Sequence, residues 1–157
     1  DTQNLHTKEI KRGKGYFEFN DWRETEELTT HGKEFPYILT TNRELEHYNC
    51  GAMTRRTSNE IILKDDYLMI NPKDASDHLI NEGDSVCLES PRGKVDVKAK
   101  ITDEVKPGVL STTFHFPDIM INNLTGDVHD SEAMCPEYKV VAVRIRKSKG
   151  KFKEASI

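Results

Sequence analysis

The sequence predicts a single domain built as a mainly-β barrel. Six or seven short runs, rich in β-branched and aromatic residues, are separated by turns that contain glycine or proline. Helical signals are limited to one or two short segments, which argues against a parallel sheet covered by helices. A length of 157 residues suits one compact domain, and no internal repeat or low-complexity linker divides the chain.

The expected strands follow one another closely along the chain. Residues 16–19 are a short strand candidate, and residues 37–41 (Tyr-Ile-Leu-Thr-Thr) have the composition of a buried strand. Further strands are expected at residues 67–70, 109–116 and 138–146. The connections at 42–56 and 117–136 are expected to be irregular or briefly helical.

One helix and one hairpin carry their own local signals. Asn71 is a suitable helix cap and Pro72 suits the first helical position, so a short helix should begin there and end before the turn around Gly83. Residues 85–90 and 94–102 flank Pro91-Arg92-Gly93, and the second run alternates strictly between apolar and polar residues. This pattern predicts a β-hairpin.

Composition excludes several classes of protein. The formal net charge of −4 argues against a nucleic-acid binder, and no apolar run is long enough to span a bilayer. Three distant cysteines form neither a disulfide framework nor a metal motif, which favours a reducing, cytoplasmic compartment. No standard catalytic motif is present, and the six histidines have no metal-ligand spacing, so no metal site is expected in this chain.

The segment after the strand at 37–41 gathers residues suited to binding. Arg43 and His47 stand four positions apart, where a helical turn would place them on one face. Arg55, within Thr-Arg-Arg-Thr at 54–57, adds a group able to bind phosphate oxygens. The competing interpretation is that these charged residues form ordinary exposed ion pairs of little energetic weight.

A second segment lies at the end of the strand at 109–116. His115 stands between Phe114 and Phe116, where it could stack on or hydrogen-bond a flat heterocycle, and Asn122 offers an amide edge of the kind a pterin requires. The competing interpretation is that the phenylalanines are core, His115 faces solvent and the asparagines form turns.

Taken together, these segments resemble the molybdopterin-dinucleotide-binding domain of the dimethyl sulfoxide reductase superfamily, with formate dehydrogenase alpha subunits most similar. The matching stretches, in the family's order and spacing, are 35–49 with 53–57, 69–75, 83–84 with 90–93, 107–109, 114–116 with 122–125, and 136–140. The resemblance implies an aspartate-decarboxylase-like double-psi β-barrel at residues 15–147. From their basic composition, residues 1–14 are expected to be a flexible lead-in and residues 148–157 a flexible tail.

The resemblance also implies a ligand, the bis-(molybdopterin guanine dinucleotide) cofactor of molybdenum or tungsten. Arg43 would bond pterin or phosphate oxygens, Glu44 and His47 would order their loop, Asn122 would bind a pterin edge, and Lys139 would reach a phosphate or ring carbonyl. The full set of expected cofactor-binding residues is Thr41, Asn42, Arg43, Glu44, His47, Tyr48, Arg55, His115, Asn122 and Lys139. Arg43, His47, His115 and Asn122 are expected to converge on one open face of the barrel.

The family's metal-ligating Cys or selenocysteine, its assisting histidine and arginine, and its cluster-binding cysteines belong to upstream domains. The isolated chain is therefore expected to be inactive and to hold no cofactor. Its expected partners are those upstream domains and electron-transfer subunits, with no nucleic acid and no direct membrane contact. Alternatives are a nitrate reductase, a formylmethanofuran dehydrogenase barrel subunit, a free-standing pterin- or nucleotide-binding module, or a structural barrel that only contacts partner chains.

Overall fold

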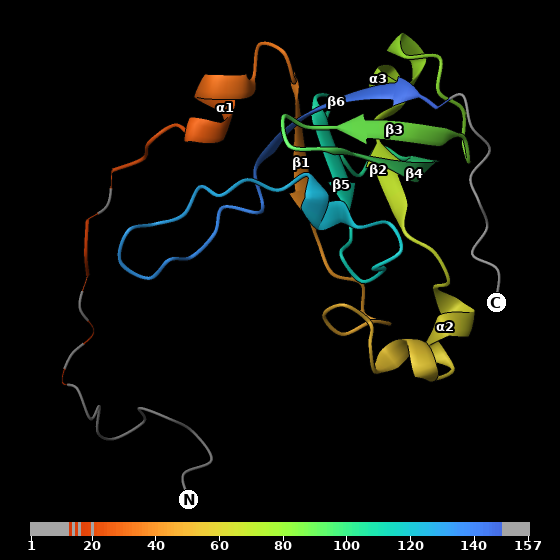
Figure 1. Cartoon of the computed structure of the whole chain (residues 1–157), viewed down its shortest axis with the longest axis horizontal. Helices are drawn as coiled ribbons and strands as arrows, with labels where there is room; N and C mark the ends of the chain where they lie inside the picture. The colour runs from red at the N-terminus through yellow and green to blue at the C-terminus, as the bar shows by residue number, and fades with distance from the viewer. Residues whose placement is uncertain (1–12, 14, 16, 20, 149–157) are drawn as a thin grey trace, which may run out of the picture.

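The computed structural model describes residues 13, 15, 17–19 and 21–148, and its six strands close into one barrel (Figure 1). Around the barrel the order is β1-β5-β2-β4-β3-β6, and β6 pairs with β1 to close it. The strands are β1 (Tyr37–Thr41), β2 (Tyr67–Ile70), β3 (Ser85–Glu89), β4 (Lys94–Ile101), β5 (Val109–Thr112) and β6 (Val141–Lys147). Short helices occupy the connections: α1 (Glu26–His31), η1 (Thr54–Arg56), α2 (Asn59–Ile62), α3 (Pro72–Asp77) and η2 (Ile121–Asn123).

The strand pairing combines two parallel and four antiparallel ladders. The parallel pairs are β1 with β5 and β2 with β4, and the other neighbours run antiparallel. A closed barrel leaves no strand edge open for pairing with another chain. The arrangement confirms the mainly-β prediction and fits the double-psi β-barrel that the resemblance implied.

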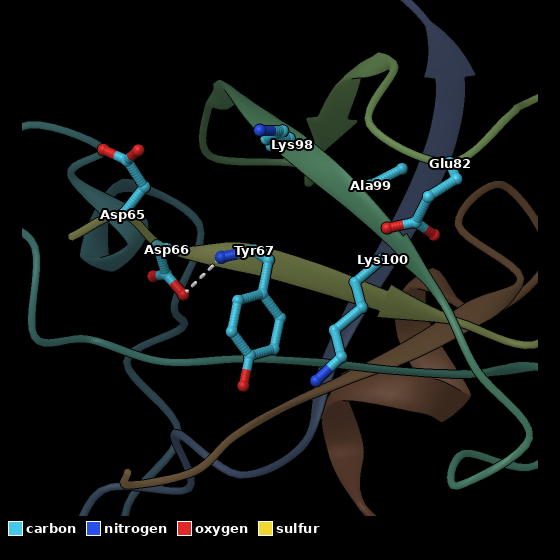
Figure 2. A pocket seen from close by; sticks show the side chains of 7 residues that line it. All are labelled: Asp65, Asp66, Tyr67, Glu82, Lys98, Ala99 and Lys100. Atoms are coloured by element: carbon cyan, nitrogen blue, oxygen red, sulfur yellow. Dashed lines mark hydrogen bonds between the residues drawn. The ribbon is translucent and has the colours of Figure 1, made fainter. Parts of the chain in front are cut away.

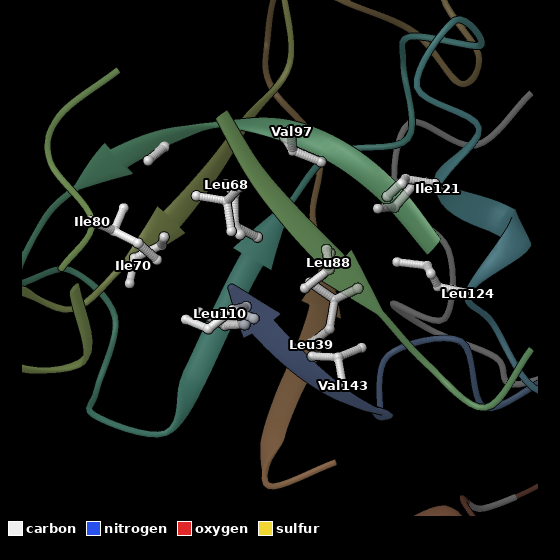
Figure 3. Close-up of a cluster of buried hydrophobic side chains, with 14 of the residues drawn as sticks. Leu39, Leu68, Ile70, Ile80, Leu88, Val97, Leu110, Ile121, Leu124 and Val143 are labelled. Atoms are coloured by element: carbon white, nitrogen blue, oxygen red, sulfur yellow. The ribbon is translucent and has the colours of Figure 1, made fainter. Parts of the chain in front are cut away.

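The barrel interior is filled by branched aliphatic side chains. Strand β4 alternates exposed and buried positions from Lys94 to Ala99, as its sequence predicted. Its inward side chains pack with Leu39, Leu68, Leu110 and Val143, all fully buried (Figure 3). Burying a side chain of this size contributes about 1.5–3 kcal/mol, so these layers supply much of the stability of the fold.

The predicted helix and hairpin are both confirmed. The side chain of Asn71 accepts a hydrogen bond from the Lys73 N–H at 3.0 Å, which caps α3, and Pro72 is its first residue. Strands β3 and β4 pair antiparallel, and the last pair before the expected turn at 91–93 is Glu89 with Lys94. Within the described residues, no helix is long and apolar enough to cross a bilayer.

Three boundaries differ from the predictions. The strand candidate at 16–19 is wrong for its described residues: Phe17 and Phe19 lie outside any strand and are 97% and 86% exposed, because the closed barrel has no edge to pair with. Tyr16 lies outside the described residues. Strands β5 and β6 are shorter than expected, β5 ending at Thr112 and β6 beginning at Val141.

The sequence analysis did not anticipate α1. Thr25 caps this helix through its hydroxyl, and Glu27 is buried against the barrel. The two oxygens of Glu27 accept from the Arg92 guanidinium at 3.0 and 2.5 Å, and one also accepts from the Ala142 N–H. Long-range pairing of this kind leaves no local pattern in the sequence. The predicted lead-in and tail lie almost wholly outside the described residues.

Candidate functional site

The loops at one end of the barrel carry most of the predicted binding residues. Strands β1 and β5 finish at this end, while β2 and β6, which run antiparallel to β5 and β1, begin there. We call it the loop end; it lies in the lower half of Figure 1, opposite α3. Thr41 closes β1, residues 42–48 follow it, His115 follows β5, and Lys139 precedes β6.

His115 is a buried support for the loop that follows β1. It is fully buried, its Nε2 accepts a hydrogen bond from the Glu44 N–H at 3.0 Å, and its Nδ1 donates to the carbonyl of Asn49. These partners require a neutral ring with its proton on Nδ1. Gly51 lies against the same segment with φ of +71°, and an added Cβ would stand 2.8 Å from the His115 carbonyl. His115 therefore fixes both ends of the 44–49 turn.

His47 supports the next part of the connection. It is 4% exposed, its Nε2 donates to the Leu63 carbonyl at 2.8 Å, and its Nδ1 lies 3.0 Å from the Thr54 hydroxyl. The ring centroids of His47 and His115 are 5.8 Å apart. Both ring nitrogens of His47 and of His115 therefore form contacts within the chain. Such contacts suit the loop-ordering role expected of His47, and His115 has contacts of the same kind.

Two cations, Arg43 and Lys139, each approach the Phe114 ring at the loop end. The guanidinium carbon of Arg43 lies 5.6 Å from the centre of the Phe114 ring, and Lys139 Nζ lies 6.0 Å from it. Lys139 also bonds the carbonyl and hydroxyl of Thr41. Within the described part of the chain, neither cation forms an ion pair. This places unneutralised positive charge at one point of an acidic protein.

Glu44 links this loop to the barrel wall. Its Oε1 accepts from the Tyr67 hydroxyl at 2.8 Å and from the Asn42 side-chain amide at 3.3 Å. The Ser111 hydroxyl donates to the side-chain oxygen Oδ1 of Asn42 at 3.2 Å. Burial, followed by the bond to Glu44, raises the pKa of Tyr67 far above its usual range, so the phenol stays a donor. Sequence reasoning missed Tyr67, because nothing local marks it as a partner of Glu44.

Asp66 is a second residue that sequence reasoning missed. It is 1% exposed, and its Oδ1 accepts from the backbone N–H groups of Tyr67 at 2.9 Å and Thr113 at 3.1 Å. Its Oδ2 and the Thr112 hydroxyl are buried and have no hydrogen-bond partner among the residues that the structure describes. Burial raises the pKa of Asp66 although the bonds to its carboxyl favour the charged form. The loop end therefore contains polar groups that the domain does not satisfy.

A depression of about 220 Å³ lies beside the loop end (Figure 2). Its lining residues are Asp65, Asp66, Tyr67, Glu82, Lys98, Ala99 and Lys100. None of the ten predicted binding residues lines it, and Lys100 covers the Tyr67 ring at 4.3 Å. Of the predicted residues, Thr41, His47 and His115 are buried, whereas Arg43, Tyr48, Asn122 and Lys139 are exposed.

The remaining predicted residues stand apart from this centre. Tyr48 is 56% exposed, and Arg55 pairs with Asp118 at 3.5 Å. Asn122 is exposed on η2, where its backbone carbonyl accepts from the Thr125 hydroxyl. The structure thus brings Arg43 and His115 to Phe114, and His47 to His115 and Phe116. Among the described residues, no hydrogen bond, ion pair or ring contact joins Asn122 to them. Among the described residues, no group of three His, Cys, Asp or Glu side chains could hold a metal ion.

A double-psi barrel with unpaired cations and unsatisfied polar groups at one end belongs to the class of ligand-binding barrels. Comparison with known proteins identifies the family. The model of the Molydopterin dinucleotide binding domain matches residues 37–142, more than half of the chain, and the chain belongs to that family. The matched range runs from the first strand of the barrel into the last.

Similar proteins are parts of much larger chains. The chain is 41% identical over 128 residues to the F420-dependent formate dehydrogenase subunit alpha of Methanocaldococcus jannaschii, covering 81% of this chain and 19% of that protein. It is 36% identical over 148 residues to the F420-dependent formate dehydrogenase 2 subunit alpha of Methanococcus maripaludis, covering 91% and 21%. It therefore spans about a fifth of the length of these curated relatives.

The same fold occurs in a solved structure. Acetylene hydratase from Pelobacter acetylenicus superposes with a TM-score of 0.65 at 16% identity, covering 77% of this chain and 19% of that one. At this identity the match shows the fold alone. The periplasmic nitrate reductase of Desulfovibrio desulfuricans is 32% identical over 120 residues, covering 73% of this chain and 15% of that protein.

Proposed function

We propose that the loop end positions a bis-(molybdopterin guanine dinucleotide) cofactor for a molybdenum or tungsten oxidoreductase that interconverts formate and carbon dioxide. The observation that carries this proposal is the approach of Arg43 and of Lys139 to the Phe114 ring. The described residues offer neither cation a carboxylate partner. Anionic phosphate oxygens would supply the missing counter-charge.

The other groups at this end fit a ligand that is flat and polar as well as anionic. The Phe114 ring is part-buried, and the amide of Asn42 and the phenol of Tyr48 lie on the same loop as Arg43. Thr41 holds Lys139, while Glu44, His47 and His115 hold the backbone from which Arg43 projects. Arg55 and Asn122 would make further contacts at the edges of the site.

The chain contributes binding and orientation, and the cofactor contributes the redox chemistry when it is bound. The highest-identity relatives named above are formate dehydrogenase subunits, which supports formate as the substrate of the whole protein. On this proposal, other domains of the whole protein supply the metal ligand, the assisting residues and the iron–sulfur cysteines. Electron-transfer subunits are further partners, and the whole protein acts in the cytoplasm. A nitrate reductase is the second candidate, supported by the 32% identity to one.

The cofactor proposal is tested in the full-length protein with an Arg43→Ala, Lys139→Ala double variant. Each lost charge-assisted bond is worth about 1.5–3 kcal/mol, so the cofactor should dissociate at least about tenfold more readily. Metal content and released guanine nucleotide measure occupancy, and activity is then expressed per bound cofactor. Occupancy should fall much more than activity per cofactor, because neither residue performs chemistry.

Arg146→Ala is the matched control, since Arg146 is an exposed cation on β6 away from the loops. Full occupancy in the double variant, or equal loss in the control, contradicts the proposed site. Assays of the purified full-length protein with formate and with nitrate separate the two substrate candidates. Elemental analysis of the 157-residue chain alone should find no stoichiometric molybdenum, tungsten, zinc or iron.

A further inference from the structure

The connection from β1 to β2 forms a folded projection at the loop end, visible below the barrel in Figure 1. We call residues 42–63 the lobe. The Asn59 amide donates to the Glu46 carbonyl at 2.7 Å, His47 donates to the Leu63 carbonyl, and His115 holds the 44–49 turn from the barrel side. These bonds tie both ends and the middle of the lobe together, so its surface is fixed in advance of any contact.

The outer surface of the lobe is unusually apolar. Five of its large hydrophobic side chains are more than half exposed: Leu45, Tyr48, Met53, Ile61 and Ile62. Ile61 and Ile62 are neighbours on the four-residue helix α2 and are 77% and 70% exposed. Arg56 and Glu60 of the lobe are exposed as well. Exposed large apolar side chains accompanied by charged ones are typical of a protein interface.

The chain spans about a fifth of the length of its relatives, which leaves about four fifths of a protein of that type to cover this surface. We propose that the lobe docks onto another domain of the same polypeptide, with Ile61 and Ile62 at the centre of the contact. This inference rests on the proposed function, because it requires the chain to be part of such a large subunit. Arg43 belongs to the lobe, and Lys139 bonds Thr41 immediately before it, so the docked domain would also close the site.

Photo-crosslinking in the full-length protein tests the docking. A benzophenone amino acid replaces Ile62, and in a matched protein it replaces Leu79, which is 80% exposed beyond α3 at the opposite end of the barrel. Mass spectrometry of irradiated protein should find position 62 joined to peptides of the same polypeptide outside these 157 residues, at least several-fold more than position 79. Products joined to a second copy or to a different chain, or no difference between the two positions, would overturn the proposal.

A second variant separates this proposal from the cofactor site. Ile61→Glu with Ile62→Glu should speed amide hydrogen exchange across residues 58–64 by about tenfold in the full-length protein, since a docked surface is protected. Glu60→Gln, at the exposed residue next to Ile61, should change this exchange little. Suppose that the Arg43→Ala, Lys139→Ala variant keeps its full cofactor content and that position 62 still forms its crosslinks. The proposed cofactor site is then wrong, and the proposed docking surface is retained. If that variant loses cofactor but position 62 forms no crosslinks, the cofactor site is retained and the docking surface is rejected.

Discussion

The α3 end of the barrel satisfies its polar groups internally, whereas the loop end does not. At the α3 end, Asp74 accepts from the Gly108 N–H at 2.7 Å, Asn71 bonds both Lys73 and the Val105 carbonyl, and Tyr37 bonds His78 at 2.8 Å. At the loop end, Asp66 Oδ2 and the Thr112 hydroxyl are buried without partners, and Arg43 and Lys139 lack counter-charges in the described chain. The α3 end is therefore complete in itself, and the loop end is the one to which the proposed cofactor site is assigned.

The largest effect should come from removing the support beneath the loops. His115→Ala leaves a cavity and strands the Glu44 N–H and the Asn49 carbonyl, so we expect a loss of about 4 kcal/mol in the free energy of unfolding. Urea denaturation of the 157-residue chain measures it. The control is His129→Ala, an exposed histidine whose loss should be nearly neutral. Equal stabilities of the two variants would mean that His115 is no support.

Glu27→Gln should cost about 3 kcal/mol at neutral pH, because it breaks a buried, twofold bond to Arg92. Burial alone would raise the pKa of Glu27, but the bonds from Arg92 and Ala142 lower it below 4.5 overall. A lowered folded-state pKa gives stability that is present above pH 4.5 and is lost as the pH falls. The cost should therefore shrink in acid, and exposed Glu26→Gln should show neither effect. A cost that is constant with pH would contradict this assignment.

At the complete end, Asn71→Ala removes both the cap of α3 and the bond to Val105. We expect a loss of about 1–2 kcal/mol in thermal or chemical unfolding. Asn71→Asp retains the capping oxygen but not the amide donor, so it should lie between the wild type and the alanine variant. An aspartate variant as damaging as the alanine variant would assign the whole effect to the bond with Val105.

Asp66→Asn should have the opposite sign and raise the free energy of unfolding by about 1 kcal/mol at neutral pH. Burial raises the pKa of Asp66, so the stability it contributes is full below the pKa of the unfolded chain and is lost as the pH rises through its folded value. The gain over wild type should vanish in acid. Asp65→Asn is the exposed control. Destabilisation at pH 7 would show that the charged form is needed.

The smallest effect on folding should come from Arg43→Ala, within about 0.5 kcal/mol, because the side chain is exposed and forms no ion pair in the described chain. The same substitution contributes to the loss of cofactor proposed above. A large stability loss would make Arg43 a structural residue and remove the contrast between the two ends.

The sequence by itself determined the features with a local cause. The alternation from Lys94 to Ala99, the turn at 91–93 and the cap at Asn71 each act over a few residues, so strand, hairpin and helix were predictable. The candidate segments after β1 and β5 were found by residue type and by resemblance to a family that the comparisons confirm. The predicted strand at 16–19 was wrong for its described residues, since residue type alone cannot supply a neighbouring strand.

Only the tertiary structure decided which distant groups meet. Barrel closure brings both Arg43 and Lys139 to the Phe114 ring, sets Asp66 against Thr113, and places Glu27 on Arg92. Among the described residues, no hydrogen bond, ion pair or ring contact joins Asn122 to Arg43, Lys139 or Phe114. These contacts depend on strand order and register, which bring together residues that are far apart in sequence. Because a hydrogen bond or charge contact changes over one or two ångströms, residue type can nominate such groups, but only the folded backbone places them.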